Sequence, residues 1–513
     1  MLVKTFGSAV SGVDAITIEV EVNEMAGREY YLVGLPDSAV KESFQRVESA
    51  LKTNGYYMPR RKLVVNLAPA AIRKTGTAFD LAIAIGILAA TEQIPNPESL
   101  LRVVLKGELQ LDGVIRPVKG ALPIAINAKK HGFTDLFVPQ QNAREAGVVE
   151  GLNVFGVGHI NEVIDHFKGE KIITPTKVDI AAAFSSSYSE AEGDFLDVKG
   201  QQNIKRALEI AAAGGHNAIL IGPPGAGKTM LASRLPTILP PLTLEEALET
   251  TKIYSVAGKL LSDATLITAR PFRAPHHTAS DMSLVGGGSI PQPGEISLSH
   301  NGVLFMDEFP EFRRTALEVM RQPMEERKLT ISRARMSVDF PASFMLLAAM
   351  NPCPCGYYNH PQKKCSCHPG AVRHYLSKIS APLLDRIDLH VEVTPVPFSQ
   401  LENEEDLESS TQIRERVIRA RTLQAGRYRL MPGVYCNAQM NKKIFRQVCT
   451  VDNEGKQLLR SAMEKLQLSA RAYDRILKVS RTIADLAGSE LISSVHLAEA
   501  IQYRSLDREN WGE

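Results

Sequence analysis

The sequence predicts an α/β protein in which a parallel-sheet domain follows an α+β N-terminal domain and precedes a helical C-terminal domain. Residues 1 to about 170 alternate short apolar runs with helical stretches. A strand, a glycine-rich loop and a helix follow one another near residue 222, and residues beyond about 400 show apolar spacing of three and four. A chain of 513 residues suggests about three domains. The predicted ranges are 1–170 for the N-terminal domain, 171–194 for a linker, 195–399 for the parallel-sheet domain and 400–513 for the helical domain.

Composition and charge are ordinary for a soluble globular protein. The formal net charge is only +2, so a nucleic-acid partner would have to be held by a local basic surface. The longest apolar stretch, Leu81 to Ala90, is about half of the ~20 residues that a membrane span needs. The N-terminus lacks a signal-peptide pattern. We therefore expect a cytoplasmic protein that does not cross a membrane.

The N-terminal domain carries apolar runs near Ala15, Lys62 and Leu136 that predict strands, and stretches Ser38 to Lys52 and Ala121 to Lys130 that predict helices. This mixture indicates an α+β domain. The chain from Lys171 to Gly193 follows it without a clear apolar period and includes Pro175, so it predicts an interdomain linker.

Part of this domain, Gly107 to Ala125 followed by Gly132 to Pro139, resembles the proteolytic domain of Lon. Lon-type proteases carry a serine nucleophile in a G-P-S-A-G loop and a lysine base some forty residues further on. Here the corresponding loop is Gly76 to Asp80, with Ala78 in place of the serine, and the lysine's neighbourhood reads Leu122-Pro-Ile124. Without a nucleophile or an amine base no acyl-enzyme can form.

We therefore expect a Lon-like fold that serves binding or assembly and not proteolysis. Thr75 or Thr77 as a substitute nucleophile is the alternative, although the sequence shows no partner base for either.

The second domain contains the pattern G-x-x-x-x-G-K-[ST] directly after the apolar run Asn217 to Ile221. Glycines allow the backbone N–H groups of such a loop to surround phosphate oxygens, and the following helix directs its positive end to the same anion. Lys228 would reach the β- and γ-phosphates, and Thr229 would ligate magnesium. The alternative is a glycine-rich turn with a chance lysine. The sequence predicts that Gly222, Pro223, Pro224, Gly225, Ala226, Gly227, Lys228 and Thr229 bind ATP.

Two further strands are predicted to end in polar residues. Gly302 to Met306 leads into Asp307 and Glu308, and Ser343 to Met350 leads into Asn351. Asp307 would hold magnesium through its waters, and Glu308 would orient and deprotonate the water that attacks the γ-phosphate. Parallel strands present their carboxyl ends at the edge where α/β sheets bind ligands, so Asn351 fits a γ-phosphate sensor.

Arg386, in the stretch Pro382 to Asp388, suits an arginine finger. Such a residue cannot serve its own phosphate loop, so the assignment implies a neighbouring subunit. The alternative is a surface salt bridge to Asp385 or Asp388.

Four of the six cysteines lie within fifteen residues, as two C-x-C pairs separated by nine residues. Two paired thiols joined by a short loop can close a tetrahedral zinc site, and no ligand position stays open, so such a zinc would be structural. Four reduced thiols on a loop are the alternative. The candidate ligands are Cys353, Cys355, Cys365 and Cys367.

Taken together, the phosphate loop, the acidic pair, Asn351 and Arg386 look like an AAA+ ATPase. Arg270 to Thr278, Gly286 to His300 and Asn351 to Gly356 resemble the magnesium-chelatase-like AAA+ ATPases and, within them, the ComM (YifB) branch. The resemblance covers essentially the whole chain. It implies ATP and Mg²⁺ as cofactors and a ring, expected to be a hexamer, that migrates branched DNA during recombination of incoming single strands in natural transformation.

The resemblance adds three expectations about residues. Arg471 matches the sensor-2 arginine of the helical lid, although an ordinary helix-surface arginine is the alternative. Ser283 to Ile290 looks like the tip of a pore insert. Lys328, Arg333 and Arg335 lie on a predicted hairpin and could contact DNA phosphates, against the alternative of a solvated charged hairpin. The pair His276-His277 marks the family without a physical role.

Two functions of different kinds follow from these predictions. The first is an ATP-driven motor on single-stranded or branched DNA. The second is a chelatase-type ATPase that remodels a protein partner, for instance during metal insertion into a porphyrin. A protease fused to an ATPase is disfavoured by the missing serine and lysine.

Overall fold

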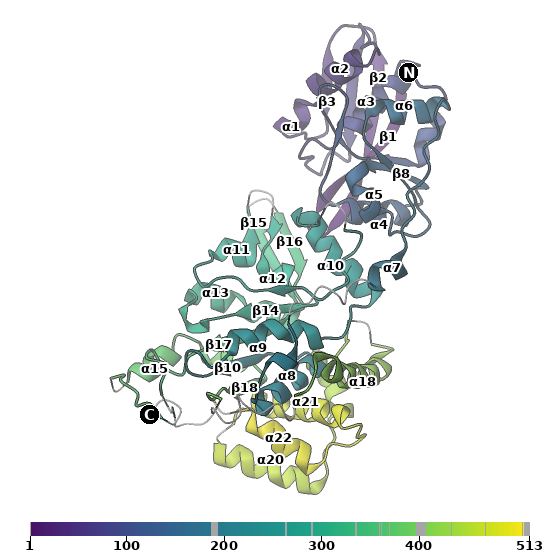
Figure 1. Ribbon diagram of the computed structural model, residues 1–513. Coiled ribbons are helices and arrows are strands. Elements are labelled where there is room, and N and C mark those ends of the chain that lie inside the picture. Colours follow the sequence, from purple (N-terminus) through teal and green to yellow (C-terminus); the bar gives the residue numbers. More distant parts are fainter. Residues whose placement is uncertain are drawn as a thin grey trace. The chain divides into compact units, whose positions relative to one another are not determined.

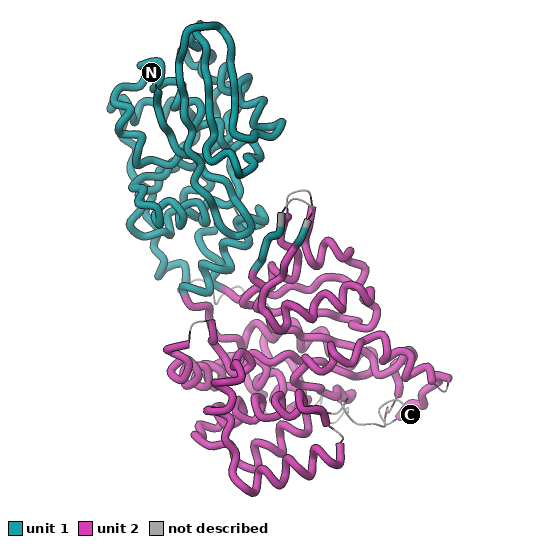
Figure 2. Tube along the Cα trace, turned by 180° about the vertical axis from the view of Figure 1, so that it is seen from behind, with its two compact units in different colours: residues 1–187, 244–268, 332–340 teal, residues 188–243, 269–331, 341–513 magenta. Residues whose placement is uncertain are grey.

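The computed structural model divides the chain into two compact units, coloured in Figure 2. Unit 1 comprises residues 1–187, 244–268 and 332–340, and unit 2 comprises 188–243, 269–331 and 341–513. The residues described below are 2–185, 193–261, 264–288, 291–333, 336–358, 360, 362–368, 370–396, 407–431, 433–466, 468–504 and 506.

Unit 1 is built on a seven-stranded mixed sheet in the order β3-β4-β2-β1-β5-β8-β9. Its long strands β1, β2 and β4 pair antiparallel, and the remaining neighbours pair parallel. The strands are β1 (Leu2–Ser11), β2 (Asp14–Met25), β3 (Tyr30–Val33), β4 (Lys62–Ala68), β5 (Val103–Leu105), β8 (Asp135–Pro139) and β9 (Asn153–Val157), with β6 (Glu108–Leu109) and β7 (Ile115–Arg116) as a separate small pair. This mixture of pairings confirms the predicted α+β character.

The helices of unit 1 are α1 (Ser38–Lys41), α2 (Ser43–Thr53), α3 (Asp80–Ala90), α4 (Ala121–Lys130), α5 (Ala143–Ala146), α6 (Ile160–Lys168), α7 (Ile180–Ser185) and α10 (Leu244–Ala257). Helices α3 and α4 pack on this sheet (Figure 1). The apolar stretch near Leu81 is α3, and every residue of α3 is buried. It is therefore a core helix, as its short length predicts.

Three details of unit 1 differ from the sequence-based expectation. The helix expected from Ser38 to Lys52 is two helices that meet at Glu42. The predicted linker contains the short helix α7, which fits the high helix propensity of its alanine run. Helix α10, which lies between segments of unit 2 in the sequence, packs with α4 in unit 1.

Unit 2 is built on a five-stranded, all-parallel sheet in the order β11-β14-β17-β10-β18. The strands are β10 (Ala218–Ile221), β11 (Phe272–Arg273), β14 (Val303–Met306), β17 (Met345–Met350) and β18 (Leu389–Glu392). Every residue of β10, β14 and β17 is buried, as expected where helices cover both faces of a parallel sheet.

Alternate residues of these strands enter two different cores. Leu220 and Leu347 pack with the helices around α8, whereas Ile219 and Leu346 pack with those around α13. The helices of the sheet domain are α8 (Gln202–Gly214), α9 (Lys228–Arg234), α11 (Asp281–Val285), α12 (Glu295–Leu298), α13 (Arg314–Val319), α14 (Arg321–Glu326), α15 (Ala371–Leu376) and α16 (Ala381–Leu384). The domain is therefore a three-layer α/β/α arrangement (Figure 1).

The C-terminal part of unit 2 is helical, as its apolar spacing predicts. Its helices are α18 (Ser410–Tyr428), α19 (Lys442–Val448), α20 (Asn453–Leu466), α21 (Ala470–Leu486) and α22 (Ser494–Gln502). Ser409 and Ser469 cap α18 and α21 by accepting hydrogen bonds from backbone N–H groups of the first turn. Among the described helices, none is both long and apolar enough to cross a bilayer.

Two further short β-pairs lie in the segment between residues 286 and 341. One consists of β12 (Gly286–Gly287) and β13 (Gln292–Pro293) and lies in the predicted pore insert. The other consists of β15 (Lys328–Arg333) and β16 (Met336–Pro341), which confirms the predicted hairpin.

Candidate active site

Three neighbouring strands of unit 2 end at one edge of the sheet. Ile221 of β10 lies opposite Met350 of β17, and Met306 of β14 lies opposite Ala348 of β17. Parallel strands in this register deliver the residues that follow them to the same edge. The sheet therefore brings together the glycine-rich loop, the acidic pair and Asn351.

The loop itself depends on its glycines. A Cβ at Gly222 would lie 2.3 Å from the carbonyl oxygen of Val393, so only glycine fits there. Gly225 and Gly227 adopt φ values of 78° and 82°, in the left-handed region that side chains other than glycine rarely occupy. The loop then enters α9 at Lys228, as the motif predicts.

Lys228 and Thr229 connect the loop to the other two strand ends. Lys228 Nζ donates to the carbonyl oxygens of Gly222 and Pro223 at 2.7 and 2.9 Å and to Asn351 Oδ1 at 3.1 Å. Burial lowers the pKa of Lys228, and the Asp307 carboxylate partly opposes that shift. The amine of Lys228 therefore lies at the point where three strand ends meet.

A pair of oxygen atoms beside this lysine fits the chemistry of magnesium. Thr229 Oγ1 donates to Asp307 Oδ2 at 2.7 Å. A hydroxyl and a carboxylate are hard oxygen ligands of the kind that Mg²⁺ prefers. The residues predicted to hold the ion are therefore adjacent.

Glu308 has a partner that the sequence did not suggest. The residue has φ 51°, and its side-chain Oε2 lies 2.9 Å from Nδ1 of His277. His277 follows β11, which pairs with β14, so it is another side chain near a strand end of this sheet. The strand-end reasoning used for Asn351 would have found it if β11, only two residues long, had been recognised.

A cavity of about 410 Å³ borders Glu308 and Asn351. Tyr375 and Lys378 of the α15 region also line it, together with Glu311. Burial raises the pKa of Tyr375, and the nearby Glu311 carboxylate adds to that shift. The polar strand ends therefore face open space and not a sealed core.

The structure does not bring the two candidate arginines to the phosphate loop. Arg386 is 6% exposed and forms an ion pair with Glu325, not with either aspartate considered from the sequence. The guanidinium of Arg471 is largely exposed, and its Nη1 lies 3.8 Å from Asp385 Oδ2. The finger and sensor-2 roles stay predictions.

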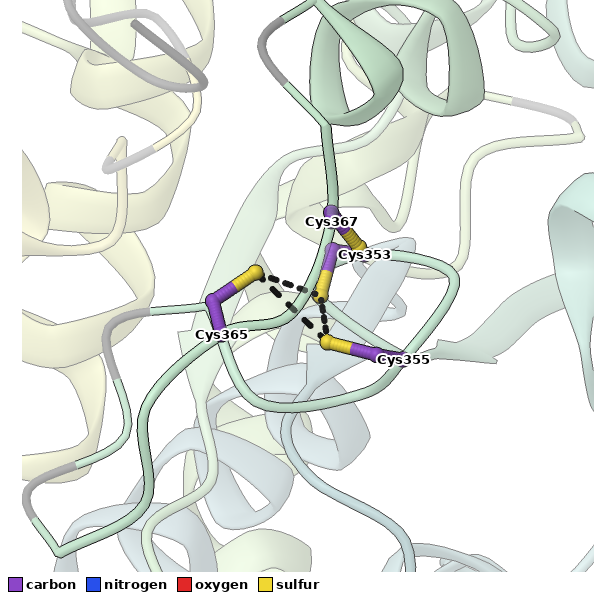
Figure 3. A group of neighbouring side chains, drawn as sticks. All are labelled: Cys353, Cys355, Cys365 and Cys367. Carbon is purple, nitrogen blue, oxygen red and sulfur yellow. Dashed lines mark hydrogen bonds between the residues drawn. The ribbon is translucent and has the colours of Figure 1, made fainter.

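The four clustered cysteines meet within 4.8 Å of one another (Figure 3). The Sγ atom of Cys353 lies 3.3 Å from that of Cys355 and 3.8 Å from that of Cys365, and Cys355 and Cys365 are 3.5 Å apart. These distances exceed a disulfide bond of ~2.05 Å. A tetrahedron with Zn–S bonds of ~2.3 Å has edges of about 3.8 Å, so the sulfur positions fit a zinc site.

This cysteine cluster adjoins the nucleotide loop. Cys353 follows Asn351 by two residues, and a Cβ at Gly356 would lie 2.5 Å from Cδ of Pro224. The loop that carries the first two thiols therefore packs directly against the phosphate loop.

The N-terminal unit offers no comparable chemistry at the Lon-like positions. Ala78 stands in place of the serine, and the neighbourhood of the required lysine reads Leu122-Pro-Ile124. The Thr77 hydroxyl donates to Glu108. The buried amine of Lys106 donates to the carbonyl oxygen of Ser8 at 2.6 Å, and that of Lys74 donates to the carbonyl oxygen of Pro69.

The candidate DNA contacts are only partly within the described residues. Lys328 begins β15. The side chain of Arg333 and the whole of Arg335 lie outside the described residues, as do Ser289 and Ile290 of the predicted insert tip.

Comparison with known proteins identifies the family. Residues 18–142, 194–401 and 407–504 match family models described as subunit ChlI of Mg-chelatase, magnesium chelatase subunit ChlI, and its C-terminal part. The chain is 44% identical over 506 residues to competence protein ComM of Haemophilus influenzae, covering 98% of this chain and 97% of that protein. It is 42% identical to YifB of Escherichia coli over 98% of this chain and 96% of that protein.

The N-terminal unit has a second, partial relationship. Lon protease 2 of Bacillus subtilis is 28% identical over 129 residues, which is 25% of this chain and 23% of that protein. With matches to ComM and YifB over nearly the full length and the nucleotide-loop geometry at the sheet edge, the chain belongs to the ComM/YifB family of magnesium-chelatase-like AAA+ proteins.

Proposed function

We propose that this protein is an ATP-driven motor that moves branch points in single-stranded or branched DNA during homologous recombination, as in natural transformation. The observation that carries the ATPase part is the convergence of Lys228, Asp307, Glu308 and Asn351 at one sheet edge. The DNA part is supported by the similarity to a competence protein over 98% of the chain. The expected setting is the cytoplasm.

The site residues have distinct roles in hydrolysis. Lys228 stabilises negative charge on the β- and γ-phosphates, and Asn351, which contacts Lys228, orients the terminal phosphate. Glu308 accepts the proton of the attacking water, while His277 fixes the direction of its carboxylate. Thr229 and Asp307 would hold magnesium, which, when bound, offsets the charge that develops on the phosphate oxygens.

The motor requires contributions between subunits and from the lid. Arg386 acts as the finger on a neighbour's γ-phosphate within a ring, proposed to be a hexamer, and this role requires its ion pair with Glu325 to open. Arg471 of the lid contacts the nucleotide and couples its hydrolysis to lid movement. Mixed rings of Arg386→Ala and Lys228→Ala protein would then recover activity that neither variant has alone.

DNA is proposed to be held through its backbone. Lys328, Arg333 and Arg335 on the β15–β16 hairpin contact phosphates, which gives binding that weakens steeply with salt and depends little on sequence. Changing Arg333 and Arg335 together to alanine should lower DNA affinity and DNA-stimulated hydrolysis, with basal hydrolysis preserved.

The deciding experiment measures ATP hydrolysis and branch migration by the full chain. Purified protein with ATP and magnesium should form rings, hydrolyse ATP faster with single-stranded or forked DNA, and move the junction of a three-strand substrate. Hydrolysis without any DNA binding at low salt would contradict the motor.

The second candidate function is remodelling of a protein partner, favoured by the three family models, all of which describe magnesium chelatase. It becomes the leading proposal if the ring hydrolyses ATP but ignores DNA. A purified partner that stimulates hydrolysis would then be its direct test.

We further propose that the cysteine cluster holds one structural zinc ion. Four sulfur atoms within 4.8 Å support this assignment. Protein purified without added metal should contain about one zinc per chain by elemental analysis, and the Cys353→Ser, Cys365→Ser double variant should contain almost none, since two of four thiolates are lost. Wild-type protein without zinc would contradict it.

A further inference from the structure

A second cavity, of about 590 Å³, lies in unit 1 and has no role in the proposed ATP site. Its lining comes from the loop 54–61, which connects α2 to β4, from α2 and from the start of β3. Both α2 and β3 are labelled in Figure 1. We call it the Tyr57 groove, after a tyrosine that is 58% exposed in its lining. Its other lining residues include Arg28, Tyr30, Tyr56 and Arg60.

Tyr57 is exposed and yet held in place. Its backbone N–H donates to Gln93 Oε1 at 3.1 Å, and its carbonyl oxygen accepts from Gln93 Nε2 at 3.0 Å. Its hydroxyl donates to the carbonyl oxygen of Thr91 at 3.2 Å. A large ring presented to solvent in a fixed orientation loses little conformational freedom when another flat ring stacks on it.

Further aromatic rings line the same groove. Tyr30 stacks on Phe44 with ring centroids 4.0 Å apart. Tyr56 lies beneath the amine of Lys168, which is 5.0 Å from the ring centroid. The groove therefore combines one exposed platform with an aromatic wall.

The charge of the lining is positive. Arg28, Lys52, Arg60 and Arg61 face two acidic residues, Glu29 and Glu48. Glu48 pairs with Lys52 at 2.7 Å, and Arg61 lies 3.7 Å from Glu24, which is outside the groove. Among the described residues, Arg28 and Arg60 have no acidic partner. Two guanidinium groups are thus available to an anionic ligand.

We propose that the Tyr57 groove binds single-stranded DNA, with a base stacked on Tyr57 and backbone phosphates at Arg28 and Arg60. Exposed aromatic rings beside cations are the combination by which proteins hold unpaired strands, because every base has a stacking face and every linkage an anion. An acidic peptide would match the cations but not the platform. The inference rests on the proposed function and adds a second DNA contact, in the Lon-like unit.

The test uses the full chain and a labelled thymidine oligonucleotide, followed by fluorescence anisotropy. It is run in wild type and in the Arg333→Ala, Arg335→Ala background, so that the hairpin does not mask the groove. Tyr57→Leu should weaken binding roughly tenfold, and Tyr57→Phe, which keeps the ring, should bind like wild type. Arg60→Glu should weaken binding and lower the salt slope by about one.

Matched controls come from the same unit. Tyr31 is 44% exposed and does not line the groove, so Tyr31→Leu should leave binding unchanged. Arg73→Glu reverses an exposed charge elsewhere in the unit and serves as the control for Arg60→Glu. Basal ATP hydrolysis should be the same in Tyr31→Leu and Arg73→Glu as in wild type.

A direct readout is photo-crosslinking of an iodouracil-containing oligonucleotide, with the modified peptide identified by mass spectrometry. A crosslink to the loop 54–61 supports the proposal. Two results overturn it while leaving the motor intact. One is equal binding with and without Tyr57→Leu in the Arg333→Ala, Arg335→Ala background, and the other is competition by poly-glutamate as strong as by the oligonucleotide. Wild-type protein that binds no DNA at low salt overturns both the groove proposal and the motor.

Discussion

Two buried lysines, one in each unit, show what distinguishes a reactive site from a tolerated buried charge. Lys228 of unit 2 and Lys106 of unit 1 are 8% and 5% exposed, and burial lowers the pKa of both amines. Lys228 lies where three strands end, beside Asp307, Asn351 and a cavity. The amine of Lys106 donates to the carbonyl oxygen of Ser8 and lies 4.6 Å from the centroid of the Phe79 ring.

The difference teaches that a lowered lysine pKa marks burial, whereas a site needs several polar groups that converge on accessible space. In unit 1 the partial sequence similarity to Lon comes with Ala78 at the serine's place. Protonation of Lys106 should therefore change the free energy of unfolding of unit 1. Substitution of Lys228 should change the binding of ATP.

The largest effect is expected for Lys228→Ala compared with Lys106→Met. Loss of the Lys228 ammonium removes charged hydrogen bonds worth about 1.5–3 kcal/mol each, so ATP affinity should fall at least about 100-fold. Binding of a fluorescent ATP analogue measures it. Lys106→Met should bind ATP with wild-type affinity. Weak ATP binding by that variant would contradict the conclusion that only Lys228 belongs to the ATP site.

Next in size is Glu308→Gln, which keeps the shape of the side chain and removes the base. Hydrolysis should fall about 10²-fold while ATP binding is retained. Glu311→Gln is the control, because Glu311 lines the same cavity but pairs with Lys378 at 3.0 Å. Unchanged turnover in Glu308→Gln would refute its assignment as the base.

The third prediction concerns pH and unit 1. Burial lowers the pKa of Lys106 to about 7, against ~10.4 in the unfolded chain. Between these values the unfolded chain binds more protons than the folded chain, so stability rises with pH. From pH 7 to 9 the contribution of Lys106 is about 2 kcal/mol.

Lys106→Met should lose this rise, because it keeps the apolar stem without the titrating amine. Pulse proteolysis of the full chain in urea, following peptides of β1 and α3, measures the difference between pH 7 and pH 9. An identical pH response in variant and wild type would show that the Lys106 amine is not the titrating group.

The smallest effect is expected at His277. His277→Ala should lower kcat about tenfold with little change in KM, since the imidazole directs Glu308 and does not hold ATP. His277→Asn, which keeps a hydrogen-bond donor near the Nδ1 position, should recover much of the loss. His276→Ala is the control, because His276 Nδ1 contacts Thr278 Oγ1 at 2.8 Å. An equal fall in both alanine variants would argue against a positioning role.

The strand ends of unit 2 could be predicted from the sequence because each signal is local. An apolar run followed by Asp307 or Asn351 indicates a buried strand and its polar end without knowledge of the partner strands. Tyr375 could not be found this way, because it comes to line the same cavity as Glu308 and Asn351 only when separate segments pack together. His277 was missed because the strand before it, β11, is only two residues long.

Other features of the structure depend on contacts between distant residues, which the apolar period of a segment does not predict. The apolar face of α10 predicts burial but does not say that α4 covers it. The backbone of Tyr57 is held by hydrogen bonds with Gln93, thirty-six residues away. The four cysteines were identified correctly as a cluster because their spacing alone keeps them close.

The course of the chain through the two units has a consequence for dissecting the protein. The chain changes unit after residues 187, 243, 268, 331 and 340. Cutting at the predicted linker would therefore leave α10 attached to the ATPase fragment without the α4 surface on which Leu248 packs. A truncated ATPase would expose this apolar face to solvent. Its aggregation would then result from the loss of the α4 contact and would say nothing about the activity of the removed unit.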